Sequence, residues 1–135
     1  MIIFITSDSN REAEIHTVIS KMRSQGIVDY FGLKNYGNDL IDVSLFLICR
    51  DPRYNFKQRI KFKKAEKRLY IDIMFDLYEM INADMETREK IIAHKFLKEI
   101  PPIIAKYKFK DFDLLKFKTD LKDWLMGNKM IDRQP

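Results

Sequence analysis

The sequence has little of the residues that build cross-linked or flexible proteins. Only one cysteine, Cys49, occurs among the 135 residues, so no disulfide can form within the chain. The 4 glycines and 4 prolines are too few for long flexible linkers, and no low-complexity tract or internal repeat is visible. Cys49 lies inside an apolar run, which predicts a buried, unreactive thiol and fits a reducing compartment.

The sequence also lacks a hydrophobic run long enough to cross a membrane. The first five residues are apolar, but no basic segment accompanies them, and the polar residues 6–10 follow directly. A short first strand explains this segment better than an export signal does. We therefore expect a cytoplasmic protein with a single domain over residues 1–126 and a flexible C-terminal tail over residues 127–135.

No arrangement of residues typical of catalysis or metal binding is present. Cys49 has no sequence context of a nucleophile, and neither His16 nor His94 has other ligand-type residues at metal-binding spacing. Gly32 and Gly37 lack the spacing and the following Lys of a phosphate-binding loop. The sequence predicts that the protein is not an enzyme and has no catalytic residue, no metal and no cofactor.

The clearest pattern in the chain is a β-hairpin whose strands are residues 57–63 and 68–75. Cationic side chains alternate with others in the first strand, and apolar side chains occupy every second position of the next, as in strands with one covered face. A turn at residues 64–67 makes the two apolar faces coincide and brings opposite charges together. The resulting pairs are Lys63 with Arg68, Phe62 with Leu69, Ile60 with Ile71 and Arg59 with Asp72.

Hydrophobic periodicity predicts three main helices around this hairpin. The first runs from a capping box at Ser9 to Gly26, and the last begins at Asp111 or Asp113 and ends at Gly127. The helix between them is capped by Asp84 and is broken or kinked at residues 101–102, which are both proline.

Together these elements predict an α+β fold. We expect a four-stranded, mainly antiparallel sheet in which a β-meander follows an N-terminal strand and helix. The sheet packs against the C-terminal helices. Its four strands are residues 2–6, 41–50, 57–63 and 68–75.

Basic residues concentrate in the hairpin. The whole chain has a net charge of +5, whereas residues 57–68 alone hold seven cations and one Glu, a local balance of +6. The remaining residues therefore sum to −1. Such a patch can bind nucleic acid or an acidic protein surface. Because the hairpin lacks Arg-Gly repeats and the aromatic signature of RNA-binding sheets, a small basic nucleic-acid-binding domain is the alternative function rather than the favoured one.

Exposed aromatic and cationic residues are the candidates for contact with a protein partner, because tyrosine and arginine dominate interface energies. Residues 28–40 mix aromatic and turn-forming residues, which predicts a loop. This loop can either pack on the core as a lid or present a contact surface. The candidates lie in this loop, in the turn at residues 51–55 and on the polar face of the hairpin: Tyr30, Tyr36, Arg53, Tyr54, Lys57, Arg59, Lys61 and Tyr70.

Much of the sequence resembles a known family. Residues 48–76 read ICRDPRYNFKQRIKFKKAEKRLYIDIMFD and are followed by Glu-Ile-Pro at 99–101 and Asp-Phe-Asp at 111–113, before the helix that bears Trp124. This pattern resembles the immunity proteins of bacterial polymorphic-toxin and contact-dependent growth inhibition systems. The likeness covers residues 1–125.

The resemblance implies a small cytoplasmic protein that binds a cognate toxin domain, a nuclease or another toxin that acts inside the cell. Binding blocks the toxin's active site or its access to substrate. Many nuclease toxins have basic clefts that acidic inhibitors match, whereas this hairpin is basic. Either the cognate toxin surface is itself acidic, or acidic residues elsewhere make the contact, such as Glu79, Asp84, Glu86 and Glu89.

Overall fold

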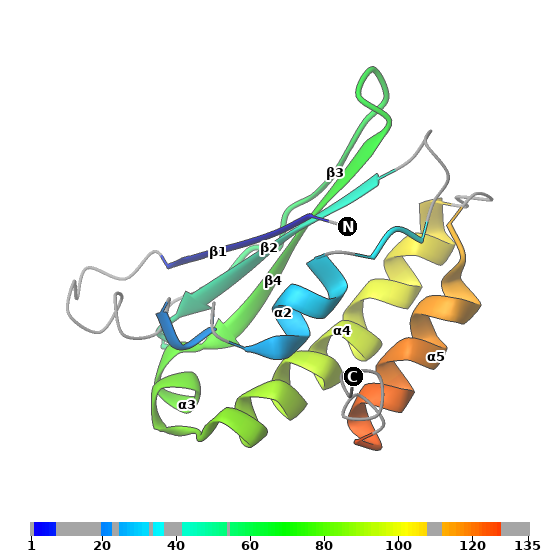
Figure 1. Ribbon diagram of the computed structural model, residues 1–135. Coiled ribbons are helices and arrows are strands. Elements are labelled where there is room, and N and C mark those ends of the chain that lie inside the picture. The colour runs from blue at the N-terminus through cyan, green and yellow to red at the C-terminus, as the bar shows by residue number, and fades with distance from the viewer. Residues whose placement is uncertain are drawn as a thin grey trace.

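A layer of helices packs against one face of a four-stranded sheet (Figure 1), which confirms the α+β class. The computed structural model describes residues 2–7, 20–22, 25–32, 34–36, 42–53, 55–107 and 112–127. The elements in chain order are β1 (Ile2–Ser7), α2 (Gly26–Gly32), β2 (Asp42–Arg50), β3 (Ile60–Lys63), β4 (Arg68–Asp76), α3 (Leu77–Asn82), α4 (Met85–Tyr107) and α5 (Leu114–Leu125).

The sheet is mixed, with the strand order β1-β2-β4-β3. β1 and β2 run parallel, and so do β2 and β4, whereas β3 and β4 are antiparallel. The predicted mainly antiparallel sheet is therefore wrong, and so is the β-meander from β2 through β3 to β4.

The position of β4 between β2 and β3 explains this difference. The chain leaves β2 at Arg50 and passes through residues 51–59 before β3 begins at Ile60. β4 then returns beside β2 in the same direction, so that Asp42 faces Arg68. Alternation within a hairpin defines the register of its two strands, but it does not specify which of them pairs with a third strand.

The predicted register of the hairpin is confirmed. Lys63 faces Arg68, Phe62 faces Leu69 and Ile60 faces Ile71. β3 itself is shorter than predicted, because it begins at Ile60 rather than at residue 57. The pairing nevertheless continues one residue further, since the Asp72 N–H donates to the Arg59 carbonyl at 2.9 Å.

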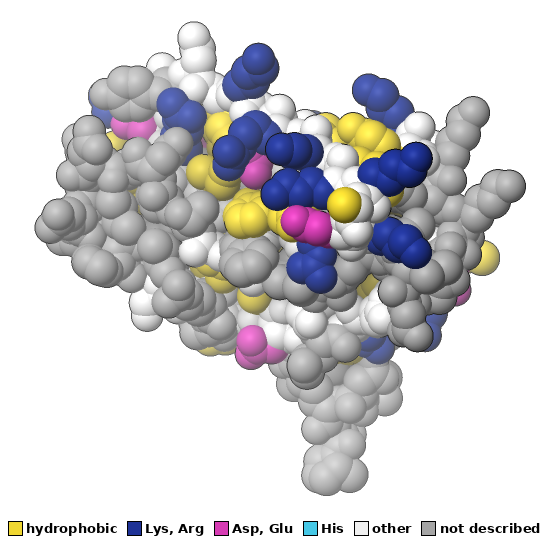
Figure 2. All heavy atoms as spheres, turned by 90° about the horizontal axis from the view of Figure 1, so that it is seen from above, with side chains coloured by type: hydrophobic (Ala, Val, Ile, Leu, Met, Phe, Trp, Pro, Cys, Tyr) yellow, Lys and Arg dark blue, Asp and Glu magenta, His cyan; other side chains and the backbone are white. Residues whose placement is uncertain are grey.

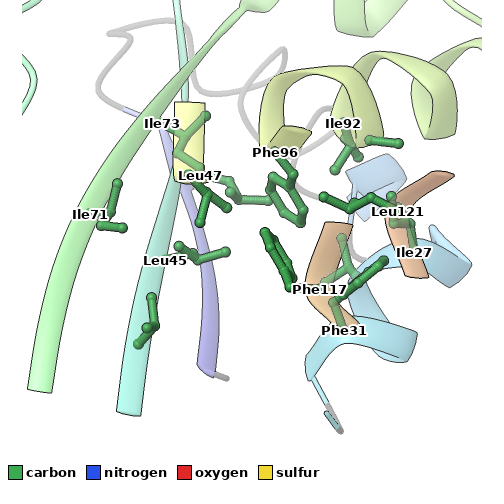
Figure 3. Packing of buried hydrophobic residues seen from close by; sticks show 14 of the residues in the cluster. Ile27, Phe31, Leu45, Leu47, Ile71, Ile73, Ile92, Phe96, Phe117 and Leu121 are labelled. Carbon is green, nitrogen blue, oxygen red and sulfur yellow. The ribbon is translucent and has the colours of Figure 1, made fainter. Parts of the chain in front are cut away.

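The helix-covered face of the sheet holds the core. Phe31 of α2 lies at the centre of an aromatic cluster, with ring centroids 6.2 Å from Phe96 of α4 and 5.8 Å from Phe117 of α5. All three side chains are fully buried. Alternate apolar residues of β2 and β4 point from the sheet toward these helices (Figure 3): Leu45, Leu47, Ile71 and Ile73.

Helix α2 occupies part of the segment that the sequence predicts as a loop. The predicted first helix has ended before Gly26, since Gln25 is not helical, but Gly26 then begins α2. The physical reason is tertiary: the Gly26 N–H donates to Glu89 Oε1 of α4 at 3.1 Å, and Ile27 and Phe31 bury their side chains against the core. Most of the predicted first helix lies outside the described residues, and residues 20–22 at its end are helical.

Helix α4 runs continuously through Pro101 and Pro102, so of the two predicted alternatives, a break or a kink, the break is wrong. Each proline removes one backbone N–H donor from the helix. Ile100 before them and Ile104 after them are buried, and we infer that this packing retains the helix across the lost hydrogen bonds. Within the described residues, no helix is long and apolar enough to cross a membrane.

The predicted helix caps are confirmed where they are described. Asp84 accepts a hydrogen bond from the Thr87 N–H at 2.8 Å, and Asp113 accepts one from the Lys116 N–H at 3.0 Å. Gly127 follows α5 with a φ of 85°, a conformation that glycine adopts without strain. The predicted tail beyond it lies outside the described residues.

Candidate partner-binding surface

The face of the sheet opposite the described helices carries a different set of side chains. Along β4, Tyr70 and Asp72 alternate with the fully buried Leu69, Ile71 and Ile73. Because α2, α4 and α5 lie on one side of the sheet (Figure 1), this alternation directs Tyr70 and Asp72 to the other side. Exposed lysines of the neighbouring β3 lie beside them. We call this surface the open face, defined by Phe46, Lys57, Arg59, Lys61, Lys63, Tyr70 and Asp72.

A groove with a volume of about 610 Å³ lies on the open face. Four of its lining residues are cationic and one is acidic. Figure 2 shows Lys and Arg side chains gathered around apolar surface on this side of the molecule. The volume is that of a pocket that holds a ligand or several partner side chains. The lining residues are Phe46, Lys57, Gln58, Arg59, Ile60, Lys61, Lys63, Tyr70 and Asp72.

The single carboxylate of the groove is already paired. Asp72 is 4% exposed, and its Oδ2 lies 2.8 Å from Nε of Arg59, the ion pair that the sequence predicts. The hydrogen bond to Asp72 raises the pKa of the Arg59 guanidinium above its usual value. Gln58 Nε2 donates to the Asp72 carbonyl at 2.8 Å and fixes the adjoining backbone. Asp72 is therefore paired with Arg59 and does not neutralise the lysines of the groove.

Two aromatic rings form the apolar part of the groove. Phe46 and Tyr70 stack with centroids 6.1 Å apart and an interplanar angle of 27°. Lys63 Nζ lies 5.1 Å from the centroid of the Tyr70 ring, a favourable cation–π distance. The Tyr70 hydroxyl donates to Glu66 Oε2 at 2.5 Å, and this bond raises the pKa of Tyr70. The aromatic side chains are thus held in place before any partner arrives.

Two lysines of the groove have no such contacts. Lys57 and Lys61 are exposed, and neither has an ion pair or side-chain hydrogen bond with another described residue. Lys63 is closer to a carboxylate, with Nζ 3.8 Å from Glu66 Oε1, but such exposed pairs are weak. Lys57 and Lys61 are therefore the cations most available to a partner.

Four of the eight predicted contact residues meet on the open face, namely Lys57, Arg59, Lys61 and Tyr70. Arg53 is not among the lining residues and instead binds Asp51 at the end of β2. Its Nη2 lies 2.6 Å from Asp51 Oδ2, and Tyr78 Oη donates to the same oxygen at 3.1 Å. These hydrogen bonds, chiefly those from Arg53, hold the pKa of Asp51 well below its usual range.

The tyrosines predicted in the loop lie elsewhere. Tyr30 belongs to α2, and its ring centroid is 5.1 Å from that of Trp124. Tyr36 is 5% exposed, and its hydroxyl donates to Asp120 Oδ2 at 2.6 Å. Burial and this hydrogen bond raise the pKa of Tyr36. Tyr36 therefore packs on the core, as the lid interpretation predicts, rather than on the exposed surface. Tyr54 lies outside the described residues.

Phe46 and Gln58 line the groove although sequence reasoning does not select them. Phe46 lies in a run of β2 in which the residues of both faces are apolar, so the sequence does not show which face the helices cover. In the structure the helices cover Leu45 and Leu47, and Phe46 lies on the opposite face. Alternation against those two core residues is the signal that places Phe46 on the open face. Gln58 carries no comparable signal, because its role depends on a hydrogen bond across to β4.

The sequence offers four acidic residues as a second contact surface. Three of them already have partners within the chain. Glu89 is buried and accepts from the Gly26 N–H, and Asp84 caps α4. Glu86 lies 3.4 Å from Lys90 Nζ. Glu79 is exposed. These carboxylates therefore do not match the concentration of charge on the open face.

The predicted buried thiol is confirmed. Cys49 is fully buried in β2, and its Sγ lies 3.0 Å from Sδ of Met22. Burial raises the pKa of the Cys49 thiol to about 12, so the thiol is protonated at neutral pH. Within the described part of the chain, no group of three or more His, Cys, Asp or Glu residues could hold a metal ion.

A large groove on an open sheet face, lined by lysines and stacked aromatics, is typical of a protein that binds another macromolecule. Residues 1–127 match the family Immunity protein 44, and because the match spans nearly the whole chain, the chain belongs to that family. The resemblance to immunity proteins is thereby confirmed. No curated protein and no solved structure matches the chain.

Membership of this family indicates the general function of the chain. It is a toxin immunity protein, which neutralises a toxin and has a cognate toxin as its partner. Families of this kind are generally not enzymes.

Proposed function

We propose that the chain acts in the cytoplasm of a bacterium against one toxin domain of the contact-dependent growth inhibition type. It forms a stable one-to-one complex with that domain and blocks the toxin's active site or its access to substrate. The open face makes the contact. Family membership supports the inhibitory role, and the groove of about 610 Å³ is the observation that favours this surface.

The organisation of the open face fits a rigid docking site. Arg59 is anchored by Asp72, and Tyr70 is held between Phe46 and the carboxylate of Glu66. A partner that docks here loses little additional side-chain freedom from these residues. Lys57 and Lys61 supply charge that remains available. The surface thus combines an ordered centre with exposed cations, a combination that supports fast and tight association.

Co-expression tests this function. The chain is produced together with the toxic domain encoded immediately upstream of its gene, and cell survival and co-purification are measured. Because very little free toxin can be tolerated, we expect a Kd in the nanomolar range or below, about −12 kcal/mol or more favourable. An unrelated toxin domain serves as the control and should not be neutralised. Cell death together with failure to co-purify would contradict the proposal.

The local charge of +6 on the hairpin also motivates the alternative function, nucleic-acid binding. If the open face binds phosphates, affinity should fall with salt with a log-log slope of about −0.7 to −0.9 per neutralised phosphate. We expect no appreciable shift of RNA or DNA at physiological salt. A tight, salt-steep complex that Arg59→Glu with Lys61→Glu abolishes would favour this alternative.

A further inference from the structure

We propose that the toxin surface that docks on the open face is acidic and places Asp or Glu carboxylates against Lys57 and Lys61. This inference rests on the function proposed above and specifies the chemistry of the partner. It selects one of the two alternatives that the sequence leaves open.

The charge of the groove favours a partner of opposite sign. Four cations and one carboxylate line it, and that carboxylate, Asp72, is buried in an ion pair with Arg59. Docking of a basic surface would bring like charges together as water is expelled, at a cost that rises as the local dielectric constant falls. Carboxylates of the partner would instead pair with ammonium groups that have no partner among the described residues.

The aromatic rings favour a protein over a nucleic acid. Binding of single-stranded nucleic acid needs ring faces on which bases can stack. In the groove, the Tyr70 ring already stacks with Phe46 and lies beneath the ammonium group of Lys63, and its hydroxyl is bonded to Glu66. The rings are engaged with one another and with the hairpin. The two rings form an apolar floor suited to an aliphatic or aromatic side chain between the partner's carboxylates.

Three of the four acidic residues that could form a second contact surface already have partners among the described residues. Glu89 is buried against the start of α2, and Asp84 is bonded to the backbone of Thr87. Glu86 is close to Lys90. The hairpin, with a local charge of +6 over residues 57–68, is therefore the better candidate for the contact, and that charge is positive.

A charge-reversal experiment tests the inference. The probe is the toxin domain encoded immediately upstream of the gene, titrated by calorimetry against the intact chain at several NaCl concentrations. The test variant carries Lys57→Glu and Lys61→Glu. The control variant carries Lys98→Glu and Lys116→Glu, an equal change of charge at exposed positions of α4 and α5. Circular dichroism establishes that each variant is folded.

We expect the hairpin variant to bind at least about 100-fold more weakly than the unaltered chain, because two attractive contacts become repulsive. The control variant should bind within about twofold. The affinity of the unaltered chain should fall with rising salt, and that of the hairpin variant should not. If the hairpin variant is unfolded, Lys57→Gln with Lys61→Gln replaces it, with an expected loss of about tenfold.

The possible failures are distinguishable. If the toxin binds the hairpin variant as tightly as the unaltered chain, the acidic-surface inference is overturned while the neutralising function stands. If the unaltered chain does not bind the toxin, the proposed function itself fails. A mixed-sequence RNA oligonucleotide is titrated in parallel. Binding of this RNA at physiological salt, lost in the hairpin variant, would overturn the inference in favour of a phosphate-binding surface.

Discussion

The two faces of β4 differ strongly although one strand of nine residues forms both. On one face, Leu69, Ile71, Ile73 and Phe75 are all fully buried beneath the helices. On the other, Tyr70 is half-buried, and Asp72 is a buried carboxylate that forms an ion pair with Arg59. Burial of apolar area stabilises the fold, whereas uncompensated charge and ordered aromatic rings are the properties of a binding surface. A single strand therefore separates the side chains that stabilise the fold from those that are available for recognition.

This separation has a measurable consequence. Substitutions on the helix-covered face should lower the free energy of unfolding. They should weaken toxin binding only to the extent that fewer molecules are folded. Substitutions on the open face should lower affinity with little change in stability. Four variants, ordered by the expected loss of stability, test whether the two faces are independent.

The largest loss is expected for Phe31→Ala. The Phe31 ring is fully buried and contacts the rings of Phe96, Phe117 and Trp124, so its removal leaves a cavity between α2, α4 and α5. We expect a decrease of about 3–5 kcal/mol in the free energy of unfolding, measured by urea denaturation. The control is Phe31→Leu, which keeps most of the volume and should lose less. A loss below about 1 kcal/mol would show that α2 is not part of the core.

A smaller loss is expected for Phe62→Ala. The sequence places Phe62 in the core because it faces Leu69 across the hairpin, and the register is confirmed. The structure shows that its side chain is only partly buried at the sheet edge, with the Tyr107 ring 6.5 Å away. We therefore expect the free energy of unfolding to decrease by about 1–2 kcal/mol, since less buried apolar area is lost than with Phe31→Ala. A loss as large as that of Phe31→Ala in the same denaturation experiment would contradict this difference.

The hairpin shows what sequence periodicity can predict. Its register, its turn and the Arg59–Asp72 pair all depend on residues fewer than twenty positions apart, and alternation constrains each of them. The buried Cys49 is predictable for the same reason, because its apolar neighbours indicate its environment. The positions of α4 and α5 follow from 3.6-residue periodicity and from the capping aspartates Asp84 and Asp113.

The strand order is not predictable from these local patterns. Pairing of β2 with β4 depends on contacts between residues far apart in the chain, and the connection at residues 51–59 permits either strand of the hairpin to lie beside β2. The start of α2 at Gly26 depends on Glu89, 63 residues away. The continuity of α4 through Pro101 and Pro102 likewise depends on packing that sequence propensity does not include.

The candidate site is predictable only where local alternation determines it, and not where strand order or tertiary packing does. Lys57, Arg59 and Lys61 are selected by alternation within the hairpin, and Tyr70 by its position opposite Lys61. Phe46 comes from β2, and only the strand order brings it to the groove. Tyr36 is an aromatic in a segment with turn residues, and its burial requires the contacts with Phe117 and Asp120.

A pH-dependent effect is expected at the end of β2. Arg53 hydrogen bonds hold the pKa of Asp51 below its unfolded value of about 3.9. A lowered pKa in the folded state means that the stabilisation is fully present above the unfolded pKa and is lost as pH falls toward the folded pKa. Asp51→Asn should therefore lower Tm at pH 7, and the difference from the unaltered chain should shrink below about pH 4.

The measurement is thermal denaturation of both proteins from pH 7 to pH 3. Arg53→Ala is the matched control, because it removes the donor and leaves the carboxylate in place. It should reduce the same pH dependence without abolishing the bond from Tyr78. A Tm difference between Asp51→Asn and the unaltered chain that is constant over this range would contradict the assignment of the shifted pKa to Asp51.

The smallest change in stability is expected for the pair Lys57→Glu and Lys61→Glu, the same variant that should lose the most affinity. Both side chains are exposed, and neither has an ion pair or side-chain hydrogen bond with another described residue, so folding loses no specific contact. We expect the free energy of unfolding to change by about 0.5 kcal/mol or less, measured by urea denaturation beside Phe31→Ala. Repulsion among the hairpin cations should even decrease, because each Glu faces a positively charged surface. A loss of stability comparable to that of Phe62→Ala would show that the open face also supports the fold, and that the two faces of β4 are not independent.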